Sequence, residues 1–320
     1  MKAEFEVKKY IEETCKYLKS MTSEEVLILV SGGVDSTTSA VLLKKAGLRS
    51  RLLLIDTGFM RAGEPGEVKD LFKRLGFKII LLDKKKYFYH AVRKKGDPLE
   101  KREAFRQAYF EIIMGYMKVN KIKWIVQGTQ FGKTKARMGH NYPTENFFKS
   151  GFRSIEPVEH LSKNQIRKIA EKIKLPGEVI GRRPFPGPGL LIRFGGEYTP
   201  QKLFLIEKAT NIVDKILSKY KSGFKNCFQM FPYLCDGLPV IFINKKEQKD
   251  FGHILLIRAV RQVEKKNNIE YYPFEIPQKI KIEIVKELMN IEKVARVCFD
   301  ATPKMGAGFN VGHGAMIEYI

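Results

Sequence analysis

Short apolar runs alternate with amphipathic stretches along the first half of the chain. The apolar runs predict buried strands at 26–30, 51–56, 78–83 and 123–127. The stretches between them have helical periodicity and predict helices at 37–46, 64–75 and 100–119. Strands that alternate with helices and are apolar on both faces are typical of a parallel sheet covered on both sides. We therefore expect an α/β domain with an open, mostly parallel sheet and helices on both faces.

The pattern changes after residues 182–190 (RRPFPGPGL), where three prolines and two glycines stop regular structure. Before this segment, 156–175 is predicted to be a loop followed by a helix. After it, the pattern predicts a smaller α+β unit, with helices at 200–220 and 279–290 and strands near 238–243, 254–261 and 294–299. We expect two domains, 1–193 and 194–320.

Composition excludes several classes of protein. Hydrophobic residues make up 44% of the 320 residues and charged residues 29%, as in ordinary globular proteins. No apolar run approaches the roughly 20 residues that span a bilayer, and residues 1–9 carry charges of both signs instead of an apolar signal core. The sequence therefore predicts a cytoplasmic protein with no membrane partner.

The charge balance is more informative. Lysine and arginine number 58 against 35 acidic residues, a net charge of +23. Such an excess attracts polyanions such as nucleotides, pyrophosphate or RNA, although a lysine-rich solvated surface explains it equally well. No RNA-recognition motif interleaves the lysines with aromatic residues, so a nucleic-acid partner is not favoured. Four cysteines without a Cys-x-x-Cys pair argue against zinc or dithiol chemistry.

The strongest chemical signal lies between the first predicted strand and the first predicted helix. It is the run Ser31, Gly32, Gly33, Val34, Asp35, Ser36. Glycines let the backbone approach a ligand closely, and a helix start offers unpaired N–H groups and the positive end of its dipole. A carboxylate such as Asp35 suits a phosphate site when Mg²⁺ lies between them. The alternative is a glycine-rich turn that binds no ligand.

Further candidates follow other predicted strands. Asp56, Thr57 and Gly58 close the second strand, and Gly128 and Thr129 follow the fourth. Ligands bind at the carboxyl ends of parallel strands, so we expect both segments to border the same crevice as the phosphate loop. Guanidinium groups in the neighbouring segments make bidentate contacts to a monophosphate, although a surface ion pair is the alternative for Arg193. These arginines are Arg61, Arg182 and Arg193.

The phosphate loop resembles that of the ATP pyrophosphatases, which cut ATP between the α- and β-phosphates and place AMP on a carbonyl oxygen. The segments 56–64 and 184–190 are similar to the ATP-pyrophosphatase subunit of GMP synthetase in its two-subunit form, and the likeness runs from about residue 5 to the C-terminus. This resemblance implies a fold of the adenine nucleotide alpha hydrolase type followed by a dimerisation and acceptor-binding domain. It implies adenylylation of XMP and amination to GMP, with ammonia from a separate glutamine amidotransferase subunit.

The resemblance also implies roles for particular residues. The 31–36 run would bind the ATP pyrophosphate, with Asp35 on Mg²⁺; Asp56, Thr57, Gly58, Gly128 and Thr129 would complete the ATP site. Residues on the acceptor side would be Arg61, Arg182, Arg193, Lys304 and Glu318. Arg137 and His140, in the stretch that matches the family's mobile lid, would be catalytic together with Asp35. A homodimer is implied as well.

Four segments depart from the family pattern. The lid motif Lys-x-His-His-Asn is replaced by 137–141 (RMGHN), and 244–250 and 264–273 lack the motifs expected there. A glycine-rich insert follows Lys304, where the family has a Pro-Pro pair. Three alternatives therefore stay open beside XMP amination. They are adenylylation of another nucleotide or an RNA base, a thiolase reaction using Cys227 or Cys235, and nucleotide binding without catalysis.

Overall fold

A computed structural model describes residues 5–128, 145–224, 226–236, 240–243, 249–265 and 268–301 of the chain. The chain forms two compact units. The first consists of Met1–Gly58, Gly63–Phe88 and Phe105–Arg182, and the second of Phe59–Ala62, Tyr89–Ala104 and Arg183–Ile320. Two short segments of the N-terminal half thus belong to the second unit.

The first unit is built on a five-stranded sheet. Its strands are β1 (Val26–Leu29), β2 (Ser50–Asp56), β3 (Ile79–Asp83), β4 (Trp124–Val126) and β5 (Arg153–Ile155), in the order β3-β2-β1-β4-β5. Every neighbouring pair is parallel, which confirms the predicted parallel sheet. The chain runs outward from β1 to β3 and then crosses back to β4. The carboxyl ends of β1 and β4 therefore flank the point where strand order reverses, the usual place for a ligand in an open sheet.

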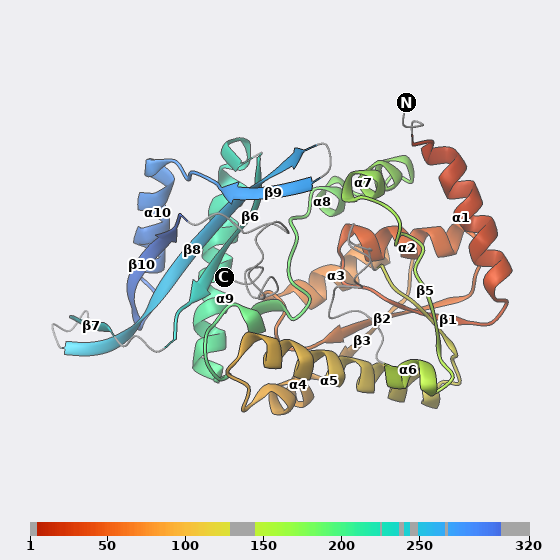
Figure 1. The fold of residues 1–320 in the computed structure, drawn as a ribbon, viewed down its shortest axis with the longest axis horizontal. Coiled ribbons are helices and arrows are strands. Elements are labelled where there is room, and N and C mark those ends of the chain that lie inside the picture. The colour runs from red at the N-terminus through yellow and green to blue at the C-terminus, as the bar shows by residue number, and fades with distance from the viewer. Residues whose placement is uncertain are drawn as a thin grey trace. The chain divides into compact units, whose positions relative to one another are not determined.

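Helices cover both faces of this sheet (Figure 1). One layer contains α1 (Val7–Met21), α2 (Val34–Lys45), α3 (Glu64–Arg74), α7 (Lys163–Lys172) and α8 (Gly177–Ile180). Within it α1, α2 and α7 contact one another, and α8 contacts α2 and α7. The other face carries α6 (Glu145–Lys149) and the part of α5 (Pro98–Val119) that belongs to this unit; α4 spans Lys85–Val92. The all-buried strands β1 and β4 need this double cover.

The second unit is a mixed α+β structure, as the sequence predicts. Its central strand β8 (Lys249–Lys265) pairs antiparallel with β6 (Cys227–Leu234), β7 (Val240–Ile243) and β9 (Asn268–Pro273), and parallel with β10 (Val294–Asp300). The helix α9 (Pro200–Lys219) packs against β6, and α10 (Gln278–Leu288) packs against α9 and β10. Two 3₁₀ turns, η1 (Gly189–Ile192) and η2 (Lys221–Phe224), also contact α9.

Some elements differ from the sequence prediction. The helix predicted at 37–46 begins at Val34, so Asp35 and Ser36 lie in its first turn. The strand predicted at 254–261 extends over 249–265, and the unpredicted strand β9 includes most of the 264–273 stretch that departs from the family pattern. Residues 183–193 cluster with the second unit. The domain boundary after Arg193 and the dimerisation role of the second domain stay predictions.

None of the helices in the described part of the chain is long and apolar enough to cross a membrane. The cytoplasmic location expected from the sequence stays a prediction.

Candidate functional site

The phosphate loop connects β1 to α2 and is held by its own serines. The amide of Ser31 donates to Oγ of Ser36 over 3.2 Å, and that hydroxyl donates to the carbonyl of Gly33 over 3.2 Å. The two serine hydroxyls are also 3.2 Å apart. These short-range bonds fold the loop tightly over the start of α2.

The two glycines have different roles in the loop. Gly32 has a φ of +70°, and a Cβ there would lie 2.7 Å from both Arg182 Nη1 and Val68 Cγ2. Only glycine fits this conformation in this space. Gly33 is the N-cap of α2 and has no side chain to cap the helix. Amides in the first turn of a helix have no acceptor within the helix, so α2 offers them to an anion.

Gly128 brings the end of β4 against this same turn. A Cβ at Gly128 would lie 2.7 Å from the amide nitrogen of Ser36 and 2.8 Å from the carbonyl carbon of Asp35. The structure therefore brings together Asp35, Ser36 and Gly128, which the sequence places almost a hundred residues apart. A side chain at this position would separate β4 from the start of α2.

The two carboxylate oxygens of Asp35 lie in different environments. Its Oδ2 forms an ion pair with Nζ of Lys163 at 2.5 Å, whereas its buried Oδ1 has no hydrogen-bond partner among the described residues. Lys163 is the first residue of α7, which begins with a capping box between Ser162 and Gln165. Sequence reasoning missed Lys163 because no local motif marks it, although the Ser-x-x-Gln spacing does mark the start of its helix.

Asp35 fits a magnesium site of the kind found on nucleotide phosphates. A buried carboxylate oxygen without a donor is a free acceptor for a cation, and Mg²⁺ on nucleotides commonly takes only one or two protein carboxylates. Among the described residues no group of three or more His, Cys, Asp or Glu side chains forms a self-contained metal cage. The donor set thus suits a metal that also binds phosphate oxygens.

At the end of β2, Asp56 organises a second turn at the same edge of the sheet. Its Oδ1 accepts from the amide of Gly58 at 2.9 Å, and its Oδ2 pairs with Nζ of Lys85 at 3.1 Å. The hydrogen bond to Asp56 raises the pKa of Lys85 above its ordinary value. Thr57, which lies between Asp56 and Gly58 in the sequence, is buried, and Gly58 has a φ of +77°. Lys85 is a further residue that the sequence motifs did not reveal.

Arg182, predicted on the acceptor side, contacts the phosphate loop itself. Its Nη1 donates to the carbonyl of Gly32 at 3.1 Å, and its Nη2 pairs with the buried carboxylate of Glu64 at the start of α3. A guanidinium can bridge two acceptors in this way because its donors lie in a rigid fork. Arg182 therefore ties the loop to α3, and Glu64 is a supporting residue that sequence reasoning missed.

The other two predicted arginines lie in the second unit. Arg61 Nε pairs with Asp214 Oδ2 at 2.9 Å, and its guanidinium lies 3.8 Å from the ring centre of Phe185. Arg193 is 2% exposed, with its guanidinium 3.3 Å from the ring centre of Phe231. The alternative of a surface ion pair therefore does not hold for Arg193.

Five predicted site residues lie outside the described part of the chain. They are Thr129, Arg137, His140, Lys304 and Glu318.

The cysteines in the structure are all free. Burial raises the pKa of the Cys227 thiol to about 11, and burial likewise raises the pKa of Cys235. A sulfur-transfer cysteine must reach its thiolate form near neutral pH, so neither environment favours the thiolase alternative.

This fold and site define a class of protein. It is the class of nucleotide-binding α/β proteins whose phosphate loop lies where the strand order of the sheet reverses. A family model described as NAD synthase matches residues 6–187. The chain is 33% identical over 314 residues to a subunit of the glutamine-hydrolyzing GMP synthase of Archaeoglobus fulgidus, covering 93% of this chain and 97% of that one. Identity to the corresponding subunit from Methanopyrus kandleri is 31%, over 94% and 97% of the two chains.

Among solved structures, the NMN synthetase from Francisella tularensis matches with a TM-score of 0.46 and 16% identity, covering 58% of this chain and 78% of that one. On the sequence relationships, the chain belongs to the family of ATP-pyrophosphatase subunits of two-subunit GMP synthases. It is a ligase-type enzyme that uses ATP.

Proposed function

We propose that this chain transfers AMP from ATP to O2 of XMP and that ammonia then displaces AMP, giving GMP and pyrophosphate. The observation that carries the proposal is the phosphate loop, where the start of α2 has no side-chain cap and Oδ1 of Asp35 has no hydrogen-bond partner among the described residues. Membership of the GMP synthase family supports XMP as the acceptor.

The chain's own residues act mainly by positioning and by electrostatics. First-turn amides of α2 bind the phosphates that leave as pyrophosphate, and they stabilise the charge that develops there. Arg182 and Glu64 hold the carbonyl side of the loop, so these donors are oriented before the substrate arrives. Lys163 adds a positive charge at the same place.

Asp35 is the residue that would hold Mg²⁺. When bound, the metal neutralises negative charge on the transferring and leaving phosphates. Asp35 itself is kept in place by Lys163, which bonds one carboxylate oxygen and leaves the other for the metal.

For the nucleoside part of ATP we propose the residues at the ends of β2 and β4. They are Asp56, Thr57, Gly58, Gly128 and Thr129. The buried Asp56 with its ordered Gly58 turn supports this assignment.

For XMP we propose Arg61, Arg182, Arg193, Lys304 and Glu318, with Arg137 and His140 acting on the reacting phosphate. Because Arg193 is buried against Phe231, its part would be to position that ring. We also propose that a separate glutamine amidotransferase subunit supplies the ammonia, because the names of the relatives describe a glutamine-hydrolyzing enzyme. We further propose that the enzyme is a cytoplasmic homodimer.

The test is an assay with XMP, ATP, Mg²⁺ and ammonium chloride, in which GMP, AMP and pyrophosphate are measured together. Equal amounts of the three products are expected, and the Asp35→Asn variant is the matched control. Folded protein that binds ATP and makes no GMP would refute XMP as the acceptor. Pyrophosphate release with another nucleotide or RNA would then indicate a paralogue, and ATP binding without any release a non-catalytic relative.

A further inference from the structure

Gln127 is a buried polar residue that the site described above does not use. It is 3% exposed, and its side-chain nitrogen Nε2 has no hydrogen-bond partner among the described residues. A buried amide donor without an acceptor costs stability, and nearly all such groups in folded proteins are paired. The Nε2 of Gln127 therefore points to an acceptor that the described part of the chain does not supply.

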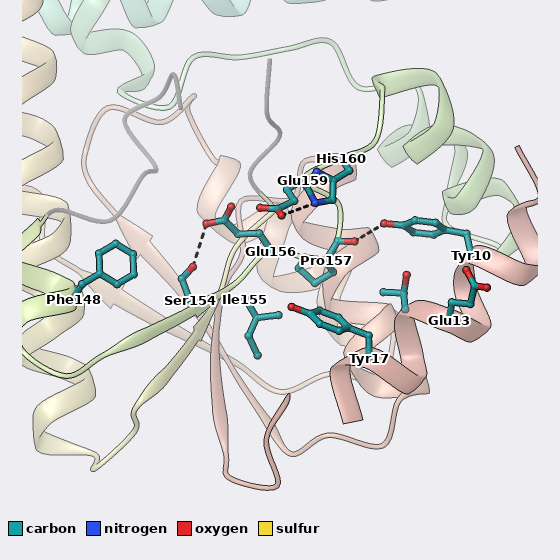
Figure 2. Close-up of a pocket in the computed structure, with 11 residues that line it drawn as sticks. Tyr10, Glu13, Tyr17, Phe148, Ser154, Ile155, Glu156, Pro157, Glu159 and His160 are labelled. Carbon is teal, nitrogen blue, oxygen red and sulfur yellow. Dashed lines mark hydrogen bonds and ion pairs between the residues drawn. The ribbon is translucent and has the colours of Figure 1, made fainter. Parts of the chain in front are cut away.

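The position of Gln127 in the sheet indicates where that acceptor lies. Gln127 directly follows β4, beside the point where the strand order reverses. Its backbone amide donates to the carbonyl of Ile155 at 3.1 Å, so the pairing of β4 with β5 continues through this residue. Figure 2 shows Ile155 at the end of β5. The side chain is thus held at the carboxyl edge of the sheet, where open α/β sheets bind their ligands.

The direction of the side chain follows from its neighbour. Successive residues of an extended strand point to opposite faces of the sheet. At Gly128 a Cβ would lie 2.7 Å from the amide nitrogen of Ser36, in the first turn of α2. Gln127 therefore points to the face opposite the start of α2. If the phosphates of ATP bind to the first turn of α2, this position suits the nucleoside better than the phosphates.

We propose that Nε2 of Gln127 donates a hydrogen bond to the nucleoside of bound ATP, at an oxygen or nitrogen of its ribose or base. The inference rests on the proposed ATP site and adds a binding residue to it. Because the donor lacks an acceptor until ATP binds, its removal should stabilise the empty protein and weaken ATP binding. A residue that serves only the fold would lose stability on the same change.

The test compares Gln127→Met with the wild type by isothermal calorimetry and by urea unfolding. Methionine has nearly the size and shape of glutamine but no donor. ATP with Mg²⁺ should bind at least fivefold more weakly to the variant. Inorganic tripolyphosphate, which has no nucleoside, should bind within twofold of the wild type. Without nucleotide, the urea midpoint should rise.

Gln278→Met is the matched control, because Gln278 is exposed at the start of α10, and it should change none of these values. Equal ATP affinity in Gln127→Met and the wild type would overturn the inference and leave the proposed function intact. A folded wild type that does not bind ATP would refute both. Equal weakening of ATP and tripolyphosphate would assign the amide to a phosphate and overturn the nucleoside contact.

Two further measurements complete the test. XMP should bind Gln127→Met as it binds the wild type, and weakened XMP binding with unchanged ATP binding would assign the amide to the acceptor instead. Gln127→Leu is a second apolar variant for the unfolding experiment. If both variants are less stable than the wild type without nucleotide, the amide is already satisfied by a buried water, and the inference is wrong.

Discussion

Single residues at the phosphate loop determine whether the ends of β1 and β4, which are neighbours in the sheet but far apart in the sequence, can contact the same ligand. Gly128 is the clearest case, because its missing side chain lets β4 end directly against the first turn of α2. The sequence marked Gly128 through its place after the fourth predicted strand and through the family resemblance. The physical reason, contact with the backbone of Asp35 and Ser36, became visible in the structure.

Gly128→Ala should weaken ATP binding at least tenfold. The new methyl group would lie 2.7 Å from the Ser36 amide, so the turn that offers the phosphate-binding amides must move. Calorimetry with ATP and Mg²⁺ measures the effect. Gly66→Ala is the control, since a Cβ at this exposed α3 position meets nothing within 4 Å. Unchanged affinity in Gly128→Ala would contradict the close approach.

Asp35→Asn should change ATP binding in opposite directions with and without metal. With Mg²⁺, affinity should fall about tenfold or more, because a charged ligand of the metal is lost. In EDTA, affinity should rise, because a negative charge beside the triphosphate is removed and Lys163 is released toward it. Asp70→Asn, at an exposed position of α3, should change neither value. A fall of equal size under both conditions would exclude a metal role for Asp35.

At the scale of elements, the phosphate loop is held from outside by α3 and by the segment after α8. Arg182 bridges the Gly32 carbonyl and the buried Glu64, so it connects three segments that are far apart in sequence. This contact makes Arg182 a support of the loop, in addition to the acceptor role that the family likeness implies.

Arg182→Met should destabilise the protein by about 2 kcal/mol, because the buried carboxylate of Glu64 loses its ion pair with Arg182. The comparison is Arg74→Met. Arg74 pairs with Glu178, and the two side chains are 59% and 64% exposed, so that loss should cost less than about 0.5 kcal/mol. Urea unfolding measures both. Equal costs would show that Arg182 does not support the loop.

Elements with a continuous apolar run were predicted well, and elements defined by their partners were not. β1 and β2 are apolar over most of their length, so their positions follow from the sequence. β5 has only Arg153, Ser154 and Ile155 and is a strand because β4 lies beside it. α2 begins three residues earlier than its apolar pattern, since the polar residues Asp35 and Ser36 occupy the first turn.

At the scale of the whole molecule, a buried lysine couples stability to pH. Lys101 is fully buried and donates to the Phe194 carbonyl at 2.8 Å, within the second unit. Burial, with a smaller effect from Lys202, lowers the pKa of Lys101 from 10.5 to about 8. The folded protein therefore releases this proton near pH 8, whereas the unfolded chain keeps it until about pH 10.5.

Between these two pH values the unfolded state binds more protons, so Lys101 makes the folded state more stable as pH rises. Relative to Lys101→Met, the wild type should gain up to about 3 kcal/mol between pH 8 and pH 10.5. Below pH 8 the difference between the two proteins should be constant. Denaturant unfolding of both proteins across this range measures it, and parallel stability curves would show that Lys101 titrates normally.

The sequence by itself determined the parallel sheet, the mixed second unit and the phosphate loop, because apolar periodicity and glycine placement are local properties of the chain. It also determined the family. Only the tertiary structure decided that Lys163, Lys85 and Glu64 support the site, and that one oxygen of Asp35 has no hydrogen-bond partner in the part of the chain that the structure describes. Those facts depend on contacts between residues up to 150 positions apart, which no local pattern encodes.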